Sequence, residues 1–313
     1  MDILDNELAV KKYRIENLPN HITRYAGTFK ETTQQTYQIA LTKFYNYLTD
    51  KHTKGLTIAN ATIIVKEYKT YLEKSTKLGS KSIDTYIIIV QSFFNNYLNL
   101  EIKNIKRSNK RKHKGKIKYL EYDEVKGLIN TVDKVTGNTE QIARDKAIIC
   151  TLFGAGLRIS ELLNIEMKDF FKENNRYYIN VIGKGNAFDE LDTIALPNQT
   201  ADYINKYLHE RRQHNRGCNY LFCSLTDNQL TRQSVNKNIK KIANAYDKLN
   251  DTNIAPRVST HSFRHSFARY CLINKQIPIN QVKDLLRHSN IETTAKYLEN
   301  SQKEIQDIRV NIF

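Results

Sequence analysis

The first clear pattern in the chain is a helical repeat of apolar residues that begins at Thr32. Apolar side chains return every three or four positions, at Tyr37, Leu41, Phe44 and Leu48. This spacing places them on one face of an amphipathic helix. Two more such helices follow, over residues 61–73 and 80–97. Helices this short are stabilised mainly by packing on one another, so residues 28–105 are expected to form a helical bundle. Residues 1–27 are expected as an N-terminal extension, with a short extra helix as the option.

The second half of the chain mixes helical patterns with a pair of strands. Residues 176–182 are rich in β-branched and aromatic residues. After the turn Gly183-Lys184-Gly185, a second strand is expected over residues 191–196. Helices are expected around this hairpin, over residues 121–132, 141–153, 201–211, 232–247, 261–273, 281–286 and 293–307. The pattern predicts a mainly α fold class with a small β-sheet or hairpin, and places an α/β domain at residues 119–313.

The two domains are joined by a basic segment without periodicity, residues 106–118. Between Lys103 and Lys118 there are nine lysines or arginines and no acidic residue. A linker of this composition can lie along a phosphate backbone, where each cation adds salt-sensitive affinity. The residues expected to bind DNA in this way are Lys103, Lys106, Arg107, Lys110, Arg111, Lys112, Lys114, Lys116 and Lys118.

The charge balance restricts the class of partner. Lysine and arginine number 49 against 33 aspartates and glutamates, a formal net charge of +16. A surplus of this size favours a polyanion such as DNA, RNA or an acidic membrane surface, although solvated lysine-rich faces are the simpler alternative. No apolar run approaches the ~18 residues of a membrane helix, and the N-terminus has no signal-peptide pattern. A cytoplasmic protein without membrane contact is therefore expected.

Metal, cofactor and disulfide chemistry find little support in the residue pattern. The four cysteines are irregularly spaced, which does not indicate disulfides. The candidate zinc ligands closest together are His209, His214, Cys218 and Cys223. The two histidines, however, lie roughly 140° apart around a helix. Gly183-Lys184 lacks the upstream glycine of a phosphate-binding loop, because Tyr178 stands there. Neither a metal nor a cofactor is expected.

Three motifs occur in a fixed order in the second domain. The first is Gly154-Ala155-Gly156-Leu157-Arg158-Ile159-Ser160-Glu161-Leu162, and the second is Thr260-His261-Ser262-Phe263-Arg264-His265-Ser266-Phe267-Ala268. The third is Leu285-Leu286-Arg287-His288-Ser289-Asn290, with Tyr297 nine residues beyond His288. Any single motif is only modestly specific, and the second by itself is compatible with an ordinary amphipathic helix. The ordered set resembles the signatures of the tyrosine recombinases, the phage-integrase and Xer-type family.

This resemblance implies a fold and a function. It covers about residues 28–300, with the helical bundle in the place of the family's core-binding domain and residues 119–313 as the catalytic domain. It implies a compact Xer-like or mobile-element recombinase that cuts and rejoins DNA at specific sites, in integration, excision or resolution. A type IB topoisomerase-like enzyme and a non-catalytic DNA-binding protein of the same fold are the alternatives.

The resemblance makes Tyr297 the nucleophile of strand cleavage. Its hydroxyl attacks the DNA phosphate, forms a 3′-phosphotyrosine and releases the 5′-oxygen, which Lys184 protonates as general acid. A phenol with an ordinary pKa near 10 is a weak nucleophile, so surrounding cations are expected to favour its phenolate. The covalent link conserves the energy of the phosphodiester, which agrees with the absence of an ATP-binding loop from the sequence.

The other residues that the resemblance assigns to the site act on the phosphate. Arg158 and Arg264 hold its non-bridging oxygens, because guanidinium groups are permanently charged and bidentate. His261 donates to the phosphate or moves the tyrosyl proton. His288 binds another phosphate oxygen. Glu161, one helical turn beyond Arg158, orients a neighbouring residue.

The resemblance also implies an assembly. The partners are double-stranded DNA with specific recombination sites and further copies of the chain, as a tetramer on two DNA sites, with a second recombinase or an accessory protein as an additional option. The end of the sequence carries apolar residues with no obvious partner in their own domain, namely Ile305, Ile308, Val310, Ile312 and Phe313. They are expected to dock on a neighbouring protomer.

Three positions depart from the family pattern. Ala187-Phe188-Asp189-Glu190 follows the turn that contains Lys184, which indicates a longer hairpin. Arg287 stands where a glycine is frequent, and Lys275-Gln276 stands where a turn glycine is common. A residue other than glycine at such a turn must tolerate or avoid φ > 0, so the local geometry is expected to differ there.

Overall fold

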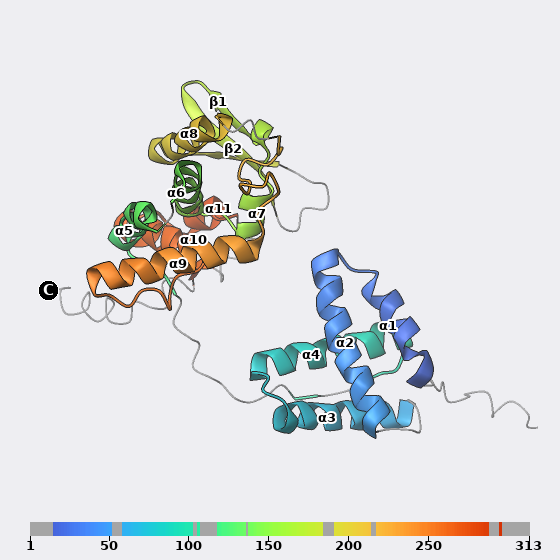
Figure 1. The fold of residues 1–313 in the computed structure, drawn as a ribbon. Helices are drawn as coiled ribbons and strands as arrows, with labels where there is room; N and C mark the ends of the chain where they lie inside the picture. The colour runs from blue at the N-terminus through green and yellow to red at the C-terminus, as the bar shows by residue number, and fades with distance from the viewer. Residues whose placement is uncertain are drawn as a thin grey trace, which may run out of the picture. The chain divides into compact units, whose positions relative to one another are not determined.

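The computed structural model describes residues 15–51, 58–102, 105–106, 118–135, 137–183, 191–213, 217–287 and 294–295. The chain divides into two compact units, Met1–Gly115 and Lys116–Phe313. Figure 1 colours the first from blue to cyan and the second from green to red. Each unit has a hydrophobic core of its own.

The first unit is a helical bundle built around aromatic side chains. Its helices are α1 (Leu18–Ala26), α2 (Glu31–Lys51), α3 (Ile58–Ser75) and α4 (Ser80–Phe93), and a π-helical turn at Phe94–Leu98 continues α4. The Phe44 ring of α2 packs edge-on against Tyr68 of α3 and against Phe94, with centroids 5.0 and 5.6 Å apart. All three side chains are buried, so the apolar faces of the helices meet at the centre of the bundle.

Helix α1 belongs to this bundle, which therefore begins earlier than the apolar spacing indicates. Leu18, Ile22 and Tyr25 of α1 are buried. The Tyr25 hydroxyl shares a hydrogen bond of 2.8 Å with the Ser92 hydroxyl of α4. The helical domain was expected to start at residue 28, but the first unit already includes α1 before that residue. A helix of nine residues offers too few turns to be recognised from spacing alone.

The second unit combines a small sheet with a cluster of helices. The helices are α5 (Tyr122–Thr131), α6 (Thr139–Gly154), α7 (Ile159–Leu163), α8 (Asn198–Arg212), α9 (Arg232–Asn250), α10 (Thr260–Arg269) and α11 (Ile279–Leu285). The strands β1 (Phe170–Glu173), β2 (Arg176–Ile182) and β3 (Leu191–Ala195) form an antiparallel sheet in the order β1-β2-β3. The predicted fold class, mainly α with a small β-sheet, is confirmed.

Strand β1 was not predicted, and a tight turn explains how it forms. Asn174 and Asn175 connect β1 to β2 with φ values of 46° and 64°. Asparagine tolerates this left-handed conformation better than most residues and is favoured in two-residue hairpin turns. Ile179 of the central strand pairs with Phe170 on one side and with Ile194 on the other. Because Ile179 is fully buried, the sheet packs one face on the core.

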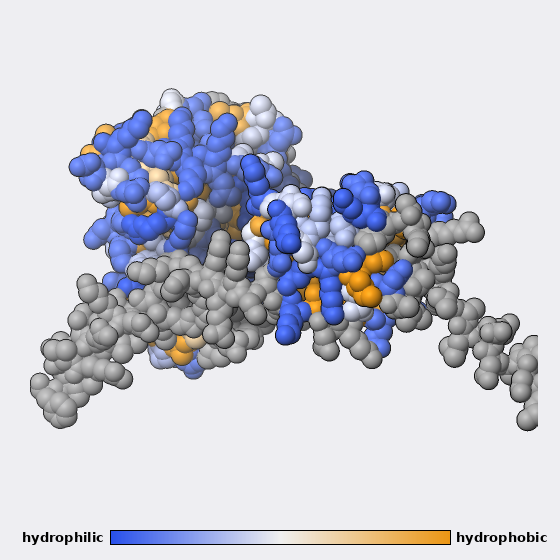
Figure 2. Space-filling model, turned by 90° about the horizontal axis from the view of Figure 1, so that it is seen from below, coloured by the Kyte–Doolittle hydropathy of each residue, from blue (hydrophilic) through white to orange (hydrophobic). Residues whose placement is uncertain are grey.

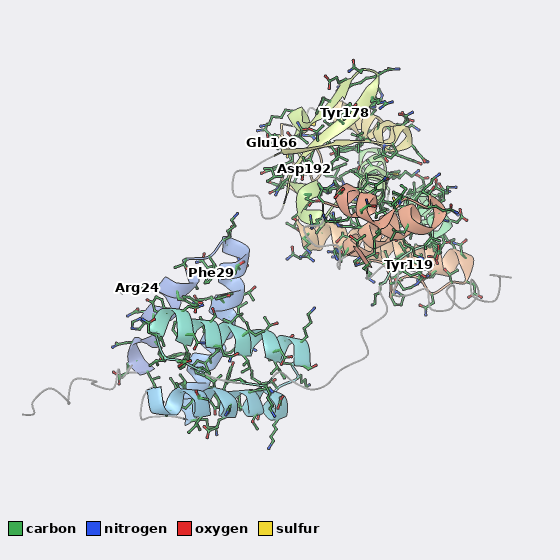
Figure 3. The ribbon with its side chains drawn as sticks, turned by 180° about the vertical axis from the view of Figure 1, so that it is seen from behind. Arg24, Phe29, Tyr119, Glu166, Tyr178 and Asp192 are labelled. Carbon is green, nitrogen blue, oxygen red and sulfur yellow. The ribbon has the colours of Figure 1, made fainter. Side chains whose placement is uncertain are left out.

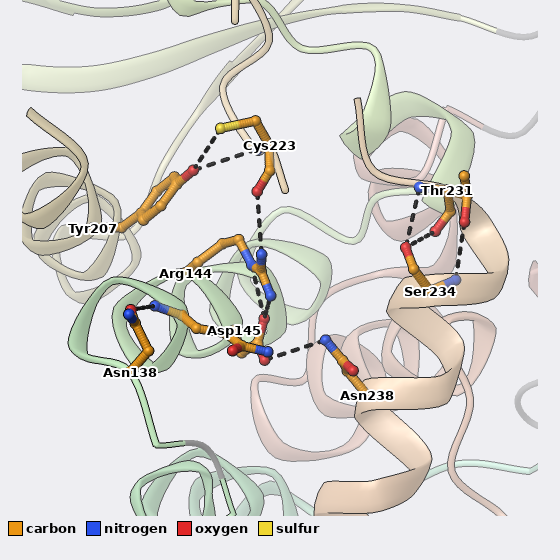
Figure 4. A network of polar contacts seen from close by, with 9 residues as sticks. Asn138, Arg144, Asp145, Tyr207, Cys223, Thr231, Ser234 and Asn238 are labelled. Atoms are coloured by element: carbon orange, nitrogen blue, oxygen red, sulfur yellow. Dashed lines mark hydrogen bonds and ion pairs between the residues drawn. The ribbon is translucent and has the colours of Figure 1, made fainter. Parts of the chain in front are cut away.

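A buried ion pair on α6 connects three helices of the second unit (Figure 4). Arg144 donates through Nε and Nη2 to Oδ1 of Asp145 at 3.0 and 2.8 Å, and through Nη1 to the Cys223 carbonyl at 3.2 Å. Asn238 of α9 donates to the other carboxylate oxygen of Asp145 at 3.5 Å. The Cys223 N–H donates to the Tyr207 hydroxyl of α8 at 3.3 Å. Since an unpaired buried charge is costly, this network fixes how α6, α8 and α9 pack.

The described surface is largely hydrophilic. Figure 2 shows mostly hydrophilic side chains on the face that it presents, with apolar residues in small groups. Exposed large apolar residues occur in both units, namely Ile39, Ile63, Ile88, Met167, Ile182, Leu191, Leu249, Ile273 and Leu285. In the part of the chain that the structure describes, no helix is both long and apolar enough to cross a bilayer.

Candidate active site

The turn at the start of α7 fixes Arg158 and Glu161 relative to each other. Arg158 is the N-cap of this helix and Glu161 is its third residue. The backbone N–H of Arg158 donates to Oε2 of Glu161 at 2.8 Å, which is the acidic half of a capping box. The Arg158 guanidinium donates through Nη1 to Oε1 at 2.6 Å. One helical turn therefore holds both the arginine and its carboxylate partner.

Two further guanidinium groups approach the same carboxylate from other helices. Arg287, which follows α11, donates from Nη2 to Oε2 of Glu161 at 2.8 Å. Nη1 of Arg264, on α10, lies 3.7 Å from Oε2, and the Glu161 side chain is only 2% exposed. Three guanidinium charges thus surround one buried carboxylate. This cluster, defined as Arg158, Glu161, Arg264 and Arg287, joins the three sequence motifs and carries a surplus of positive charge.

The arginines keep Glu161 ionised in spite of its burial. Burial by itself raises the pKa of a carboxyl group, because it penalises the charged form. At Glu161 this effect is outweighed by the charge of Arg287 and by the hydrogen bonds and charge of Arg158, so the pKa of Glu161 lies below its usual value. An ionised Glu161 offsets part of the repulsion among the three arginines.

Arg264 is anchored by backbone carbonyls from two segments. Its side chain is 1% exposed. Nη1 donates to the carbonyl of Gly156 at 2.6 Å, and Nη2 donates to the carbonyl of Leu286. Helix α10 begins at the N-cap Ser259, whose hydroxyl accepts the N–H of Ser262 at 3.2 Å. Arg264 therefore fastens the loop before α7 to the end of α11, and its charge acts on the site from inside the protein.

The loop before α7 depends on Gly156. Its φ is +57°, in the left-handed region that favours glycine. A Cβ atom at this position would lie 2.6 Å from Cδ1 of Phe267 on α10. Glycine therefore lets the backbone approach α10 closely enough for its carbonyl to accept from Arg264.

His261 lies one helical turn before Arg264 on α10 and is exposed. Its ring packs edge-to-face on that of His265, with centroids 4.3 Å apart. The protein removes part of the hydration of the ring, and the charges of Arg264, Arg158 and Arg232 oppose its protonation further, so the pKa of His261 lies below its usual value. The imidazole is therefore neutral at neutral pH, with a nitrogen that can accept a proton.

Arg158 is the member of the cluster that a ligand can reach most easily. Its side chain is 26% exposed, whereas those of Glu161 and Arg264 are 2% and 1% exposed. Among the described residues, no group accepts a hydrogen bond from Nε or Nη2 of Arg158. The Arg158 guanidinium is held by a carboxylate through Nη1, and its Nε–Nη2 edge, to which no described residue is bonded, suits a bidentate contact with phosphate oxygens.

Half of the expected catalytic residues lie outside the described residues: Lys184, His288 and Tyr297. Lys184 belongs to the connection between β2 and β3, together with the expected longer hairpin at residues 187–190. His288 directly follows Arg287 in the chain. The roles of these three residues stay predictions, as does the docking of the C-terminal segment, which is also outside the description.

The basic linker is described only at Lys106 and Lys118. The Lys118 ammonium donates to the carbonyl of Pro256 at 2.9 Å, so it has a contact within the second unit. The carbonyl of Lys106 accepts from the Lys69 ammonium at 2.6 Å. The other expected DNA contacts fall outside the described residues, namely Lys103, Arg107, Lys110, Arg111, Lys112, Lys114 and Lys116. Contacts of this segment with DNA stay a prediction.

The ionic contacts of Arg287 were not predicted. Arg287 and Gln276 have φ values of +54° and +52°, so both residues adopt the left-handed conformation at positions where glycine was expected. Nε of Arg287 lies 3.7 Å from Oδ2 of Asp192, which Figure 3 labels at the start of β3. The sequence did contain a signal for this ion pair. A charged residue that replaces glycine in a partly buried turn needs an oppositely charged partner, and the first motif supplies one in Glu161.

The candidate zinc ligands do not come together as a set. Among the described residues, the ligand atoms of Cys218, Cys223 and Asp227 lie within 4.8 Å of one another. The Asp227 carboxylate is already in use, because it accepts two backbone N–H groups at 2.7 and 3.0 Å. His209 is not part of this group, and His214 lies outside the described residues. The contacts of Asp227 hold a turn in place, and they involve no residue of the cluster around Glu161.

Comparison with known proteins gives consistent matches. The model of the phage integrase family matches residues 118–304. Tyrosine recombinase XerC of Staphylococcus epidermidis is 26% identical over 298 residues, which cover 93% of this chain and 94% of that protein. The structure of XerH site-specific recombinase bound to palindromic difH substrate has a TM-score of 0.70 at 20% identity, over 93% of this chain and 84% of that one. The Tn1549 transposon integrase in complex with transposon right end DNA has a TM-score of 0.68 at 17% identity, over 95% and 100%.

Replacing Gly156 by alanine is expected to destabilise the second unit. The new Cβ meets the ring of Phe267 and the backbone stays at a φ of +57°, so a loss of more than about 1 kcal/mol is expected in urea unfolding. Gly137→Ala is the matched control, because a Cβ there has nothing within 4 Å. Equal stability of the two variants would contradict a strained turn at Gly156.

Glu161→Gln tests whether the carboxylate stabilises the cluster. Glutamine keeps the shape and removes the counter-charge of three arginines, so a loss of about 3 kcal/mol or more is expected at neutral pH. The pKa of Glu161 is lowered in the folded chain. Its contribution is therefore complete above the unfolded value of ~4.3 and is lost as the pH falls through the folded pKa. Urea unfolding of parent and variant should converge at acidic pH.

Glu173→Gln is the control for this comparison, because Glu173 is exposed at the end of β1. It should match the parent within about 0.5 kcal/mol at every pH. A Glu161→Gln deficit that stays constant from neutral to acidic pH would show that the carboxylate charge is not what stabilises the cluster.

Proposed function

The chain belongs to the phage integrase family, and from this membership we propose how its residues carry out recombination. It is a site-specific DNA recombinase of the tyrosine type. Its relatives are named as recombinases and integrases, and several neighbouring structures contain DNA. DNA relaxation without site choice and DNA binding without catalysis are therefore not favoured.

In the proposed reaction, the Tyr297 hydroxyl attacks the phosphorus of the scissile phosphodiester. A bond forms between phosphorus and the tyrosyl oxygen, and the bond between phosphorus and the 5′-oxygen breaks. Lys184 gives a proton to the leaving 5′-oxygen, and the DNA 3′ end stays attached as a phosphotyrosine. Attack by the 5′-hydroxyl of a second strand reverses these steps and rejoins the DNA. One phosphodiester replaces another throughout, so the reaction needs no external energy source.

The surplus positive charge around Glu161 is the main observation that supports this proposal. In the five-coordinate transition state, the non-bridging phosphate oxygens gain negative charge. The Nε–Nη2 edge of Arg158, to which no described residue is bonded, can hold two of these oxygens, while Arg264 and Arg287 add positive charge from less exposed positions. Donors that are fixed before the reaction stabilise such charge strongly, because they need no reorganisation. His288 adds a further contact to a phosphate oxygen.

His261 completes the proton balance of the attack. Its pKa lies below the usual value because of lost hydration and the nearby arginines, so the ring is neutral at neutral pH and has a nitrogen that can accept a proton. In the proposal it accepts the proton that Tyr297 loses on attack and returns it when the strand is rejoined. The same arginines favour the phenolate of Tyr297 once DNA brings phosphate and tyrosine together.

The assignment of Tyr297 is tested with a nicked suicide substrate that carries the recombination site. The parent chain is expected to form a covalent protein–DNA adduct, visible on a denaturing gel. Tyr297→Phe should bind the same DNA with similar affinity and form no adduct, because the attacking oxygen is missing. Tyr178→Phe on β2 is the control and should behave as the parent. An adduct that persists in Tyr297→Phe contradicts the assignment.

We further propose that the protein acts as a tetramer on two DNA sites, joined through the C-terminal segments. An apolar pocket of about 300 Å³ on the second unit supports this arrangement, and its lining includes Val125, Ile129, Phe153, Phe267 and Tyr270. Residues 304–313 of a neighbouring protomer carry five apolar residues that can fill such a pocket. Burial of these side chains is the driving force for the contact.

Deletion of residues 304–313 is expected to spare binding to a single DNA site and to impair pairing of two sites or their cleavage. Native gels with one or two labelled sites measure both properties. Ile308→Ser should reproduce part of the defect, whereas Gln306→Ser in the same segment should not, because only the first loses apolar area. Unchanged recombination by the deletion variant would refute the arrangement.

A further inference from the structure

Arg287 adopts a backbone conformation that is costly for any residue with a Cβ atom. It follows α11 with a φ of +54°, at a helix end where glycine is usual. Its backbone N–H donates to the carbonyl of Asp284 at 2.9 Å, so the helix end is closed in the ordinary way. Glycine would make the same turn without strain. The contacts of the arginine side chain are therefore what distinguishes this residue.

Those contacts join two separate parts of the site. Nη2 of Arg287 donates to Oε2 of Glu161 at 2.8 Å, and Nε lies 3.7 Å from Oδ2 of Asp192. Asp192 is the second residue of β3 and pairs with Val181 of β2. The connection between these two strands contains Lys184. The Arg287 side chain is 13% exposed, so it bridges the two carboxylates largely away from solvent.

We propose that Arg287 is a positioning residue for strand cleavage: it holds Glu161 so that this carboxylate presents Arg158 to the scissile phosphate, and it ties the cluster to the β2–β3 hairpin. This inference rests on the proposed function and deepens it. Arg287 acts through Glu161 and Asp192 and is not itself placed on the reacting atoms.

The charges that face Glu161 show why this contact matters. Arg158 approaches from the turn before α7, Arg264 from α10 and Arg287 from the end of α11, while Asp192 of β3 reaches the group only through Arg287. Without Arg287, Oε2 keeps the Arg158 N–H, Oε1 keeps the Arg158 guanidinium, and the Arg264 guanidinium lies 3.7 Å from Oε2. The carboxylate then loses its contact with the end of α11, so its orientation, and with it that of the Arg158 side chain, is held by fewer contacts.

Arg287→Gly tests the role of the side chain alone, because it removes the guanidinium and keeps the turn. Glycine accepts the observed φ without strain, so a defect cannot come from the backbone. Arg287→Lys keeps the charge but not the fork of donors. Lys283→Ala is the matched control, because it removes a cation from α11 whose described ion pair is with Asp284 at 3.8 Å. Adduct formation on a saturating suicide substrate and the Kd for DNA are measured separately.

The expected effect falls on the chemical step. Arg287→Gly should slow adduct formation on the order of tenfold or more, as for other misplaced catalytic groups, with the Kd for DNA almost unchanged. Arg287→Lys should recover part of the rate, and Lys283→Ala should match the parent. A defect in the Kd alone, at an unchanged cleavage rate, overturns the proposal.

The pH profile separates positioning from a purely structural role. The charge of Arg287 is the largest influence that lowers the pKa of Glu161, and its removal raises that pKa. Glu161 must be ionised to hold Arg158, so the acidic limb of the cleavage rate should move to higher pH in Arg287→Gly. It should stay in place in Lys283→Ala. Urea unfolding measured at the same pH values separates the two roles, because the shift of this limb is expected within the pH range in which the variant is still folded.

Two results would overturn the inference: a parent-like rate and pH profile in Arg287→Gly, or a slower rate with an unmoved acidic limb. Failure of the proposed function looks different. In that case the parent chain itself forms no adduct, or the adduct survives in Tyr297→Phe, whatever residue stands at position 287.

Discussion

The site of this recombinase depends on one buried electrostatic contact, that of ionised Glu161 with three guanidinium groups. Like charges repel strongly where water is scarce, so arginines this close together need a shared counter-charge. Glu161 supplies it and, even with Asp192 beside Arg287, leaves the cluster positive. In the proposed reaction, the phosphate of DNA completes the balance. Under this proposal, the contact that stabilises the free protein also creates the affinity for the phosphate on which the chemistry takes place.

Backbone carbonyls around the cluster hold one of its arginines in place. Gly156 brings its carbonyl to Arg264, and Arg264 in turn reaches the carbonyl of Leu286 at the end of α11. Three motifs that are far apart in the sequence are thereby joined through one side chain. The buried pair Arg144 and Asp145 stabilises the surrounding helices in the same manner. These two buried networks define geometry where an apolar core alone would allow more freedom.

The sequence allowed the helices, the β2–β3 hairpin and the mainly α fold class to be predicted, because apolar spacing is a local signal. Strand β1 was missed, since four residues give little periodicity, and α1 was expected at most as a short extra helix of the N-terminal extension rather than as part of the bundle. Motif order pointed to Arg158 and Arg264, but not to the carbonyls that anchor Arg264. The contact of Arg287 with Glu161 joins residues 126 positions apart, and such a contact depends on how α7 and α11 pack.

The most direct test of this account compares Arg158→Ala with the parent chain on two substrates, one with an ordinary scissile phosphodiester and one with a methylphosphonate at that position. On the phosphodiester, the variant should form the covalent adduct on the order of a hundredfold more slowly or worse. On the methylphosphonate, which lacks the charged non-bridging oxygen, most of this deficit should disappear. An equal deficit on both substrates would contradict the claim that the cluster around Glu161 acts by holding phosphate charge.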